Sequence, residues 1–406
     1  MQKIFLRISL LIYFVSYLNA YGDQQLQDDI RRFAQEYLDS RFVSCTYLFT
    51  EGNHAILKGA KGLFSMEQNE ELKFDQEMPI ASATKVMTAS IILKLQARGK
   101  LNVKDTVAHH LNKKSGIWEN NKVPQWAKEV TIHHLLTHTS GLVEYFMALD
   151  IDPGKTLKDI TRDIANFAGK TPLAFTPGSN YEYCNTNFIF LGLIIEHITK
   201  KDLATVYEEE IFKPLGMKHT RLIPLQEAIA SQIEDGNIVN HPIRYFATPT
   251  GFRPYLTVAK HGLKFLMVPF ADGGVASNVE DLLIWQQALH SGKVLPKNLY
   301  KLMVRKHYEI PCQIIGKKHY TGYGIFMIEM DNGEFIYHHS GRAVAIRSES
   351  GYIPAKNLYF AVLSNVMEYI PTQLENFFNL EKPCNQLDIK YFLKYIIENL
   401  YNNQGT

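Results

Sequence analysis

The spacing of apolar residues changes twice along this chain of 406 residues. A helical period over residues 25–38 is followed by alternating apolar and polar positions over 42–64, which predict a hairpin with its turn at Glu51–His54. Between about 78 and 214 strand signals nearly vanish. A 3.6-residue period in that stretch predicts four helices: Thr84–Ala97, Thr131–Thr137, Leu157–Ala168 and Asn187–Lys200.

Strand signals return after Leu215, as short segments divided by Gly, Asn and Pro. The predicted strands are Tyr323–Ile328, Glu334–His338, Ala343–Ile353 and Leu358–Leu363, and a C-terminal helix follows at Ile389–Tyr401. Strands at both ends and helices in the middle predict an α+β fold, an α/β sandwich. Its antiparallel sheet is flanked by N- and C-terminal helices and carries an inserted all-helical domain. We expect the sheet domain to comprise residues 21–80 and 245–402, and the mainly helical domain to comprise residues 81–244.

Residues 1–20 have the pattern of a secretory signal peptide. Lys3 and Arg7 precede an apolar run over 8–18, which is shorter than the roughly 20 residues of a membrane-spanning helix. Leu18 stands three residues before the expected cut, where a small residue is preferred, so an uncleaved N-terminal anchor stays open. No comparable run occurs later, so the mature chain is expected to have no integral membrane domain and to be secreted or periplasmic.

Composition and charge exclude several classes of protein. The chain is 46% hydrophobic and 21% charged, which argues against disorder. Its 43 Lys+Arg and 41 Asp+Glu give a net charge of +2, and loss of Lys3 and Arg7 with the signal peptide would leave the mature chain formally neutral. A neutral chain has no field to gather nucleic acid or anionic membrane, so neither is expected as a partner.

The four cysteines are widely spaced, at Cys45, Cys184, Cys312 and Cys384. They allow three disulfide pairings, among which the sequence does not choose. With no C-x-x-C and no nearby His pair, a structural zinc site is not expected. Most of these cysteines are expected to be small buried hydrophobes.

The first candidate chemistry is Ser82 and Lys85, the only Ser-x-x-Lys in the chain, at the start of a predicted helix. This spacing places hydroxyl and amine on one face, one turn apart. The helix is uncharged over 86–93, so Lys85 lies beside a buried face, and burial would lower its pKa and let it take the serine proton. The alternative is an N-cap serine followed by a solvated lysine.

Two further groups precede or follow predicted elements. Tyr183 and Asn185 stand just before an apolar helix, and side chains two apart in an extended segment point the same way. His339, Ser340 and Gly341 stand at the end of the strand that reaches His338, where Gly341 would let the backbone approach a ligand.

In this order, Ser-x-x-Lys, Tyr-x-Asn and His-Ser-Gly resemble the motif set of the serine β-lactamase and penicillin-binding-protein superfamily. Three more stretches resemble its class C β-lactamase-like branch, which includes D-alanyl-D-alanine carboxypeptidases and esterases. They are Thr131–Leu142, Phe212–Met217 and Gly273–Ser277 before Asp281–Leu282. The resemblance covers roughly residues 40 to 365 and implies a β-lactamase/transpeptidase-like fold with the active site between the two domains.

The resemblance also implies a role for each residue. Ser82 would be acylated while Lys85 and Tyr183 shuttle the proton; Asn185 would orient Lys85 and the substrate amide. His339 would position Tyr183 or the leaving group. Ser340 would bind a substrate carboxylate, and the backbone N–H groups of Ser82 and of Arg342, which follows Gly341, would hold the oxyanion. No metal or organic cofactor is implied.

Three features depart from the pattern or compete with it. Cys184 stands where Ser is frequent, and by alternation we expect it to pack away from the cleft. His339 stands where dedicated β-lactamases usually carry Lys, and a largely neutral imidazole suits carboxypeptidase-like or esterase-like members better. His133, His134 and His138 resemble a metal cluster, but no Glu follows in the zinc-protease arrangement, so we expect a structural role.

Two classes of function therefore stay open. One is an exported serine hydrolase acting on small acyl donors with peptide, lactam or ester bonds. The other is a slow-turnover sensing module that binds penicillin or cell-wall fragments and stays acylated. The presence of every proposed site residue favours the hydrolase. The sequence does not predict an oligomeric state.

Overall fold

The computed structural model describes residues 28, 32, 44–65, 68–146, 148–228, 245–248, 251–254, 268–314, 317–343 and 346–368. The predicted signal peptide, the predicted C-terminal helix and Cys384 lie outside these residues, as do all but two residues of the predicted N-terminal helix. None of the described helices is long and apolar enough to cross a membrane.

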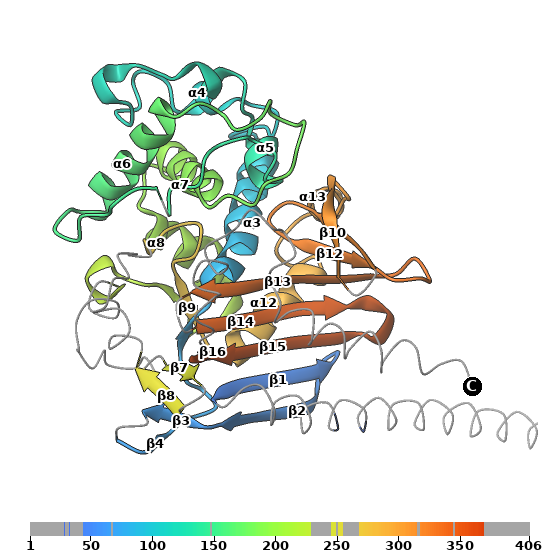
Figure 1. The fold of residues 1–406 in the computed structure, drawn as a ribbon. Helices are drawn as coiled ribbons and strands as arrows, with labels where there is room; N and C mark the ends of the chain where they lie inside the picture. Colours follow the sequence, from blue (N-terminus) through green and yellow to red (C-terminus); the bar gives the residue numbers. More distant parts are fainter. Residues whose placement is uncertain are drawn as a thin grey trace, which may run out of the picture.

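An antiparallel sheet of eight strands dominates the fold, in the order β10-β11-β12-β13-β14-β15-β1-β2. Its strands are β1 Cys45–Glu51, β2 His54–Lys61, β10 Tyr308–Ile314, β11 Lys317–Thr321, β12 Phe326–Glu329, β13 Phe335–Ala343, β14 Ile346–Ile353 and β15 Leu358–Ser364. Figure 1 shows blue β1 lying beside red β15, so the sheet joins segments from distant parts of the chain.

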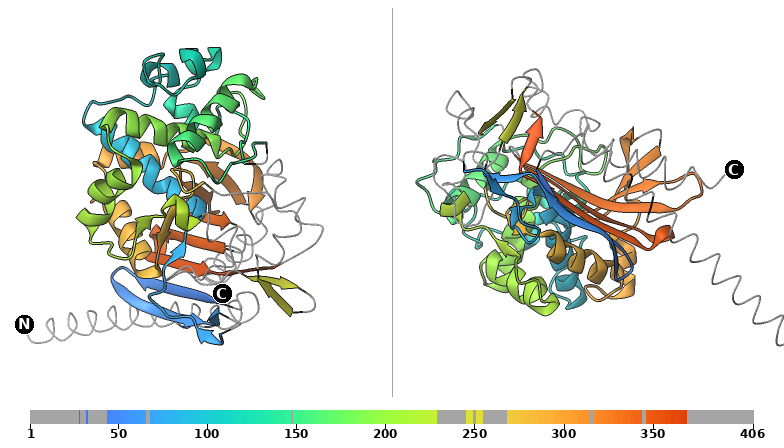
Figure 2. Two further views of the ribbon diagram at one scale, coloured as in Figure 1. Left: turned by 90° about the vertical axis from the view of Figure 1, so that its left-hand side faces the viewer. Right: turned by 90° about the horizontal axis from the view of Figure 1, so that it is seen from below.

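Helices from the middle of the chain pack beside this sheet. They are α3 Thr84–Ala97, α4 Val107–His110, α5 Ile132–Leu136, α6 Leu157–Lys170, α7 Thr186–Thr199, α8 Leu203–Tyr207, α9 Lys213–Leu215, α12 Val279–His290 and α13 Lys297–Met303. Single turns of other helix types are η2 Ala81–Ala83, η3 Glu119–Asn121, η4 Gln125–Lys128, η5 Glu208–Phe212 and η6 Pro354–Lys356. In the view from below, α12 lies against one face of the sheet, and Gln286 Nε2 donates to Ser350 Oγ of β14 at 2.9 Å (Figure 2).

Three small sheets complete the described structure. They are β5 Met78–Pro79 with β9 Val275–Ser277 and β6 Arg221–Leu222; β3 Leu63–Ser65 with β4 Glu70–Glu71; and β16 Val366–Glu368 with β7 Tyr245–Thr248 and β8 Gly251–Pro254. The first of these ties the segment before η2 to the segment after Asp272.

The core is centred on α3 and α7, which contact each other. In α3 every residue from Thr84 to Leu93 is buried, and in α7 every residue from Thr186 to Ile195 is buried. A helix that is buried all round must lie inside the molecule. Both helices begin at candidate site residues, so the core fixes those residues in place.

The predicted fold class is confirmed, and three local predictions were wrong. The strand predicted to stop at His338 continues to Ala343, because Gly341 serves a close approach and not a turn: a Cβ there would lie 1.8 Å from the Ile80 carbonyl oxygen. Ala343–Ile353 comprises the end of β13 and the separate strand β14. The strand predicted from Tyr323 begins only at Phe326, because Gly324 has φ +64 and turns the chain.

Several elements escaped the sequence prediction. Helix α12 carries clear signals, with Asn278 accepting a hydrogen bond from the backbone N–H of Asp281 as its N-cap. Strands β10 and β11 were also missed. The boundaries predicted for the two domains stay predictions, and the short strand β6 lies within the range expected to be mainly helical.

Candidate active site

Ser82 lies in the 3-10 turn η2, which leads directly into α3. Lys85 Nζ lies 3.0 Å from Ser82 Oγ, as the one-turn spacing predicts. The residue before Ser82, buried Ala81, has φ +47, a left-handed conformation that costs a non-glycine residue roughly 1–2 kcal/mol. The packed surroundings hold this turn, and Ser82 is left partly exposed while Lys85 is fully buried.

The Lys85 amine has two further oxygen partners. Asn185 Oδ1 lies 2.8 Å from Nζ and the Asp272 carbonyl oxygen lies 2.5 Å away. The rings of Tyr183 and Phe188 also lie close, with centroids 5.1 and 5.5 Å from Nζ. Burial lowers the pKa of Lys85 to about 8, although the nearby acidic groups act to raise it. About a tenth of the amine is therefore neutral at pH 7, far more than for an ordinary lysine.

Tyr183 is hydrogen-bonded to Ser82 through its side chain. Burial raises the pKa of the Tyr183 phenol well above its ordinary value, so the free protein holds it as a neutral hydroxyl. Its ring stacks on His138, with centroids 4.4 Å apart and planes 25° apart. His138 Nδ1 in turn accepts a hydrogen bond from the Cys184 backbone N–H at 3.1 Å. His138 thus fixes the segment that presents Tyr183.

Cys184 is buried in the main hydrophobic core as a free thiol. Burial raises the pKa of this thiol well above its usual range, so the reactive thiolate is disfavoured. This placement agrees with the expectation that Cys184 packs away from the cleft. Cys45 is also buried, whereas nothing is described of the Cys312 side chain.

Two carboxylates near Lys85 were not predicted from the sequence. Glu144 accepts hydrogen bonds from the backbone N–H groups of Asn185, at 2.6 Å, and Phe146, at 3.0 Å. Burial raises the pKa of Glu144 to about 7. Asp272 is buried, accepts from the Tyr145 hydroxyl at 3.0 Å, and has its pKa raised by burial. Glu144 closely follows one family-like stretch and Asp272 directly precedes another, which was the available signal.

The third motif lies on β13. His339 and Gly341 are two residues apart and therefore lie on the same face of the strand. At Gly341 that face packs on Ile80, which precedes η2. His339 Nδ1 lies 2.6 Å from the Ser340 carbonyl oxygen, and its ring stacks on Phe326 with centroids 4.7 Å apart. Burial holds the pKa of His339 well below its ordinary value, and the charge of Lys85 acts in the same direction.

Ser340 and Arg342 follow on β13 and are both partly exposed. Strand β12 pairs with β13 only as far as His338. From residue 339 to 343, β14 is therefore the one neighbouring strand among those described. The backbone groups of β13 that point away from β14 have no strand partner there. The same end of β13 contacts η2, which carries Ser82. Such an edge can offer backbone N–H groups to a ligand.

The structure thus brings Ser82, Lys85, Tyr183 and Asn185 into direct contact and places the His339–Arg342 segment beside η2. Of the histidines that resembled a metal cluster, His133 Nδ1 lies 2.9 Å from the Tyr323 hydroxyl. His134 Nδ1 accepts from the Thr131 backbone N–H at 3.2 Å and completes a capping box. Both contacts are structural.

Comparisons with known proteins agree with this geometry. The family model described as Beta-lactamase matches residues 30–381. Protein flp of Staphylococcus aureus (strain MW2) is 26% identical over 337 residues, which are 81% of this chain and 61% of that protein. Esterase EstB of Burkholderia gladioli is 30% identical over 215 residues, 50% of this chain and 53% of that protein. The chain therefore spans less than two thirds of the length of these curated relatives.

A solved structure extends the likeness to three dimensions. The octameric penicillin-binding protein homologue from Pyrococcus abyssi superposes with a TM-score of 0.67 at 25% sequence identity, covering 87% of this chain and 78% of that one. Because the family model spans most of the sequence, the fold agrees, and amine and hydroxyl meet at the start of α3, the chain belongs to the Beta-lactamase family.

Proposed function

We propose that this protein is an exported hydrolase that acylates Ser82 with small donors carrying amide, lactam or ester bonds. The observation that carries the proposal is the placement of the buried Lys85 amine 3.0 Å from Ser82 Oγ. Serine is a weak nucleophile unless a base takes its proton, and a lysine whose pKa is lowered by burial can do so. Export rests on the pattern of residues 1–20, and N-terminal sequencing of the secreted protein tests it.

The proposed acylation begins when Ser82 Oγ attacks the substrate carbonyl carbon and its proton passes to Lys85 Nζ. The carbonyl oxygen becomes an oxyanion, which the backbone N–H groups of Ser82 and Arg342 stabilise; one such donor is worth about 10²–10³ in rate. Collapse breaks the bond to the leaving group, which takes the proton through Tyr183. A water molecule then attacks the acyl-enzyme and gives its proton to the same groups. The proton returns to Ser82 Oγ as the ester bond breaks and the acid is released.

Around this path the other residues position the reacting groups. Asn185 Oδ1 holds the Lys85 amine and leaves the amide nitrogen for the substrate. His339 Nε2 is buried and has no hydrogen-bond partner among the described residues, and we assign to it the role of accepting from Tyr183 or from the substrate during the reaction. Ser340, beside it, would donate to a substrate carboxylate.

Among acyl donors we favour peptides ending in D-alanyl-D-alanine or simple esters. A neutral His339 stands where dedicated β-lactamases usually carry a lysine and gives the site little positive charge. This suits an uncharged ester, whereas the carboxylate of a peptide would depend on the Ser340 hydroxyl. The names of two relatives cover these two kinds of substrate: one is an esterase and the other is a penicillin-binding protein homologue. Side-by-side turnover of a D-Ala-D-Ala peptide, a short-chain nitrophenyl ester and a chromogenic cephalosporin tests this preference.

Stable labelling of Ser82 with no turnover of any of the three substrates would contradict the hydrolase proposal. It would show instead a slow-turnover sensing module that stays acylated. Fast cephalosporin turnover alone would assign a β-lactamase.

Tyr183→Phe is expected to slow turnover by about 10²-fold or more while changing substrate binding little, because it removes only the hydroxyl that carries the proton. The ring keeps its stacking on His138. Pre-steady-state kinetics separate the acylation rate from the dissociation constant, and Tyr181→Phe is the matched control on the same segment. Unchanged turnover in Tyr183→Phe would remove Tyr183 from the proton path.

The pH profile of kcat/KM is expected to rise about tenfold per pH unit up to a midpoint near the pKa of about 8 of Lys85, because only the neutral amine accepts a proton. Glu144 is mostly ionised above its pKa of about 7, and its negative charge favours protonated Lys85. Glu144→Gln should therefore move the midpoint to lower pH, by up to about one unit.

Exposed Glu129→Gln is the control for this experiment, and its midpoint should match that of the unmodified protein. A flat profile in the unmodified protein would contradict a titrating base, whereas an unmoved midpoint in Glu144→Gln would limit Glu144 to a structural role.

A further inference from the structure

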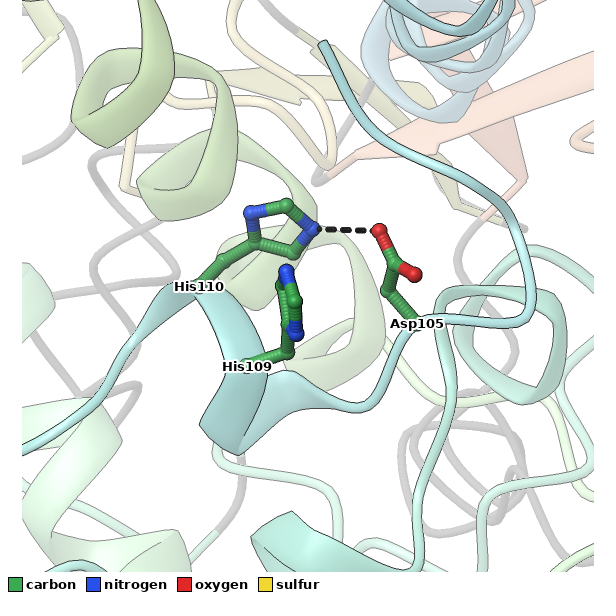
Figure 3. Close-up of side chains that lie close together, drawn as sticks. All are labelled: Asp105, His109 and His110. Carbon is green, nitrogen blue, oxygen red and sulfur yellow. Dashed lines mark hydrogen bonds and ion pairs between the residues drawn. The ribbon is translucent and has the colours of Figure 1, made fainter. Parts of the chain in front are cut away.

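A cluster of potential metal ligands lies far from Ser82, at the start of α4. Asp105, His109 and His110 each offer one ligand atom, and these atoms all lie within 4.8 Å of one another (Figure 3). The Asp105 Oδ2 atom lies 2.9 Å from His110 Nε2, and the two imidazole rings meet edge to face with centroids 4.7 Å apart. Figure 1 shows α4 at the end of the helical region away from β13.

The backbone that carries these side chains is fixed on both sides. The Asp105 carbonyl oxygen accepts from the Ile132 N–H at 3.0 Å, and the Val107 N–H donates to the Val130 carbonyl at 2.9 Å. Thr106 caps α4 through the His109 N–H. Ligands held on a fixed frame lose less freedom on binding an ion.

Two of the three side chains already hold each other in place. His110 is only 8% exposed, and the contact between its Nε2 atom and Asp105 Oδ2, at 2.9 Å, fixes the orientation of both groups before an ion binds. Contacts that orient ligands in this way favour metal binding.

Capacity for ligation is unused in the free protein. Within the described part of the chain, the two ring nitrogens of His109 make no hydrogen bond, and the Oδ1 atom of Asp105 makes none either. His109 is exposed, so an ion can reach the cluster from solvent. Tetrahedral ligands at about 2.0 Å from Zn²⁺ lie about 3.3 Å apart, which small side-chain rotations from the observed separations would reach.

We propose that Asp105, His109 and His110 form a binding site for a divalent transition-metal ion, separate from the acylation site. Two imidazoles and one carboxylate suit Zn²⁺ and its neighbours, and water would complete the coordination. The ion would cross-link the turn before α4 to the helix itself and so stabilise the segment without taking part in hydrolysis.

The test is a titration of tag-free, chelator-treated full chain with Zn²⁺, followed by calorimetry, and with Co²⁺, followed by its visible absorption. We expect saturation at one ion per chain and a rise in thermal midpoint with added Zn²⁺. His109→Ala should weaken binding about tenfold or more and abolish that rise. Because His109 is exposed, this variant should fold.

Exposed His54→Ala is the matched control and should bind as the unmodified chain does. Failure to saturate below about 1 mM Zn²⁺ would overturn the proposal. So would equal affinities in His109→Ala and the unmodified chain, which would place the ion elsewhere. Asp105→Asn, which keeps the size of the side chain but removes its charge, should also weaken binding.

Discussion

Ser82→Ala is expected to abolish covalent labelling by a fluorescent penicillin or an activated-serine phosphonate, and to lower kcat by roughly 10⁴-fold or more. The physical reason is that the change removes the one oxygen that attacks the substrate carbonyl. Lys85 then has no proton to take, and Tyr183 loses its hydroxyl partner. What activity remains would come from the oxyanion donors and substrate binding alone.

The variant should fold normally, because Ser82 is partly exposed and alanine fits the 3-10 turn η2. Circular dichroism and thermal unfolding check this point. Ser291→Ala, an exposed serine after α12, is the control and should label like the unmodified protein. Equal labelling of Ser82→Ala would show that a different side chain is acylated.

The part of the site that the sequence predicted is the part set by local geometry. Ser82 and Lys85 are three residues apart at a helix start, so their contact follows from the pitch of a helix. Tyr183 and Asn185 share a direction because they are two apart in an extended segment. Their contact with Lys85 spans about 100 positions, and only the resemblance to a family, not the spacing, pointed to it.

The missed residues are those whose roles depend on burial. Glu144 and Asp272 are ordinary acidic residues in the sequence, and their positions next to family-like stretches do not state that they will lie near Lys85. In the folded chain both act to raise the pKa of Lys85. The length of β13 was misjudged for a similar reason, because the need for Gly341 arises from Ile80, more than 250 residues earlier.

The fold follows the same rule. Helix α6 was predicted closely because its apolar face recurs at helical spacing, and α3 and α7 were predicted closely because each carries a long, largely apolar run. The prediction that strands from both ends of the chain form one sheet rested on economy, and the pairing of β1 with β15 confirms it. Helix α12 was missed although its N-cap Asn278 and the acidic residues of its first turn were visible in the sequence.

Lys85→Met is expected to reduce the acylation rate by about 10³–10⁴-fold, because methionine fills the buried space but cannot accept the Ser82 proton. Lys85 is fully enclosed, and its loss leaves the Asn185 Oδ1 atom and the Asp272 carbonyl oxygen without their donor, so the free energy of unfolding should fall by about 1–3 kcal/mol. Lys94→Met, on the same helix and outside the site, is the matched control. The burst of product from a nitrophenyl ester measures acylation in each variant.

Lys85→Arg separates a base from a fixed positive charge. Arginine keeps the charge but does not deprotonate in proteins, so it should be as slow as Lys85→Met if Lys85 acts as the base. A Lys85→Met enzyme that acylates within about tenfold of the unmodified rate would exclude Lys85 as the base. Partial activity in Lys85→Arg alone would instead assign to Lys85 an electrostatic role, with the Ser82 proton leaving through the hydrogen bond to Tyr183.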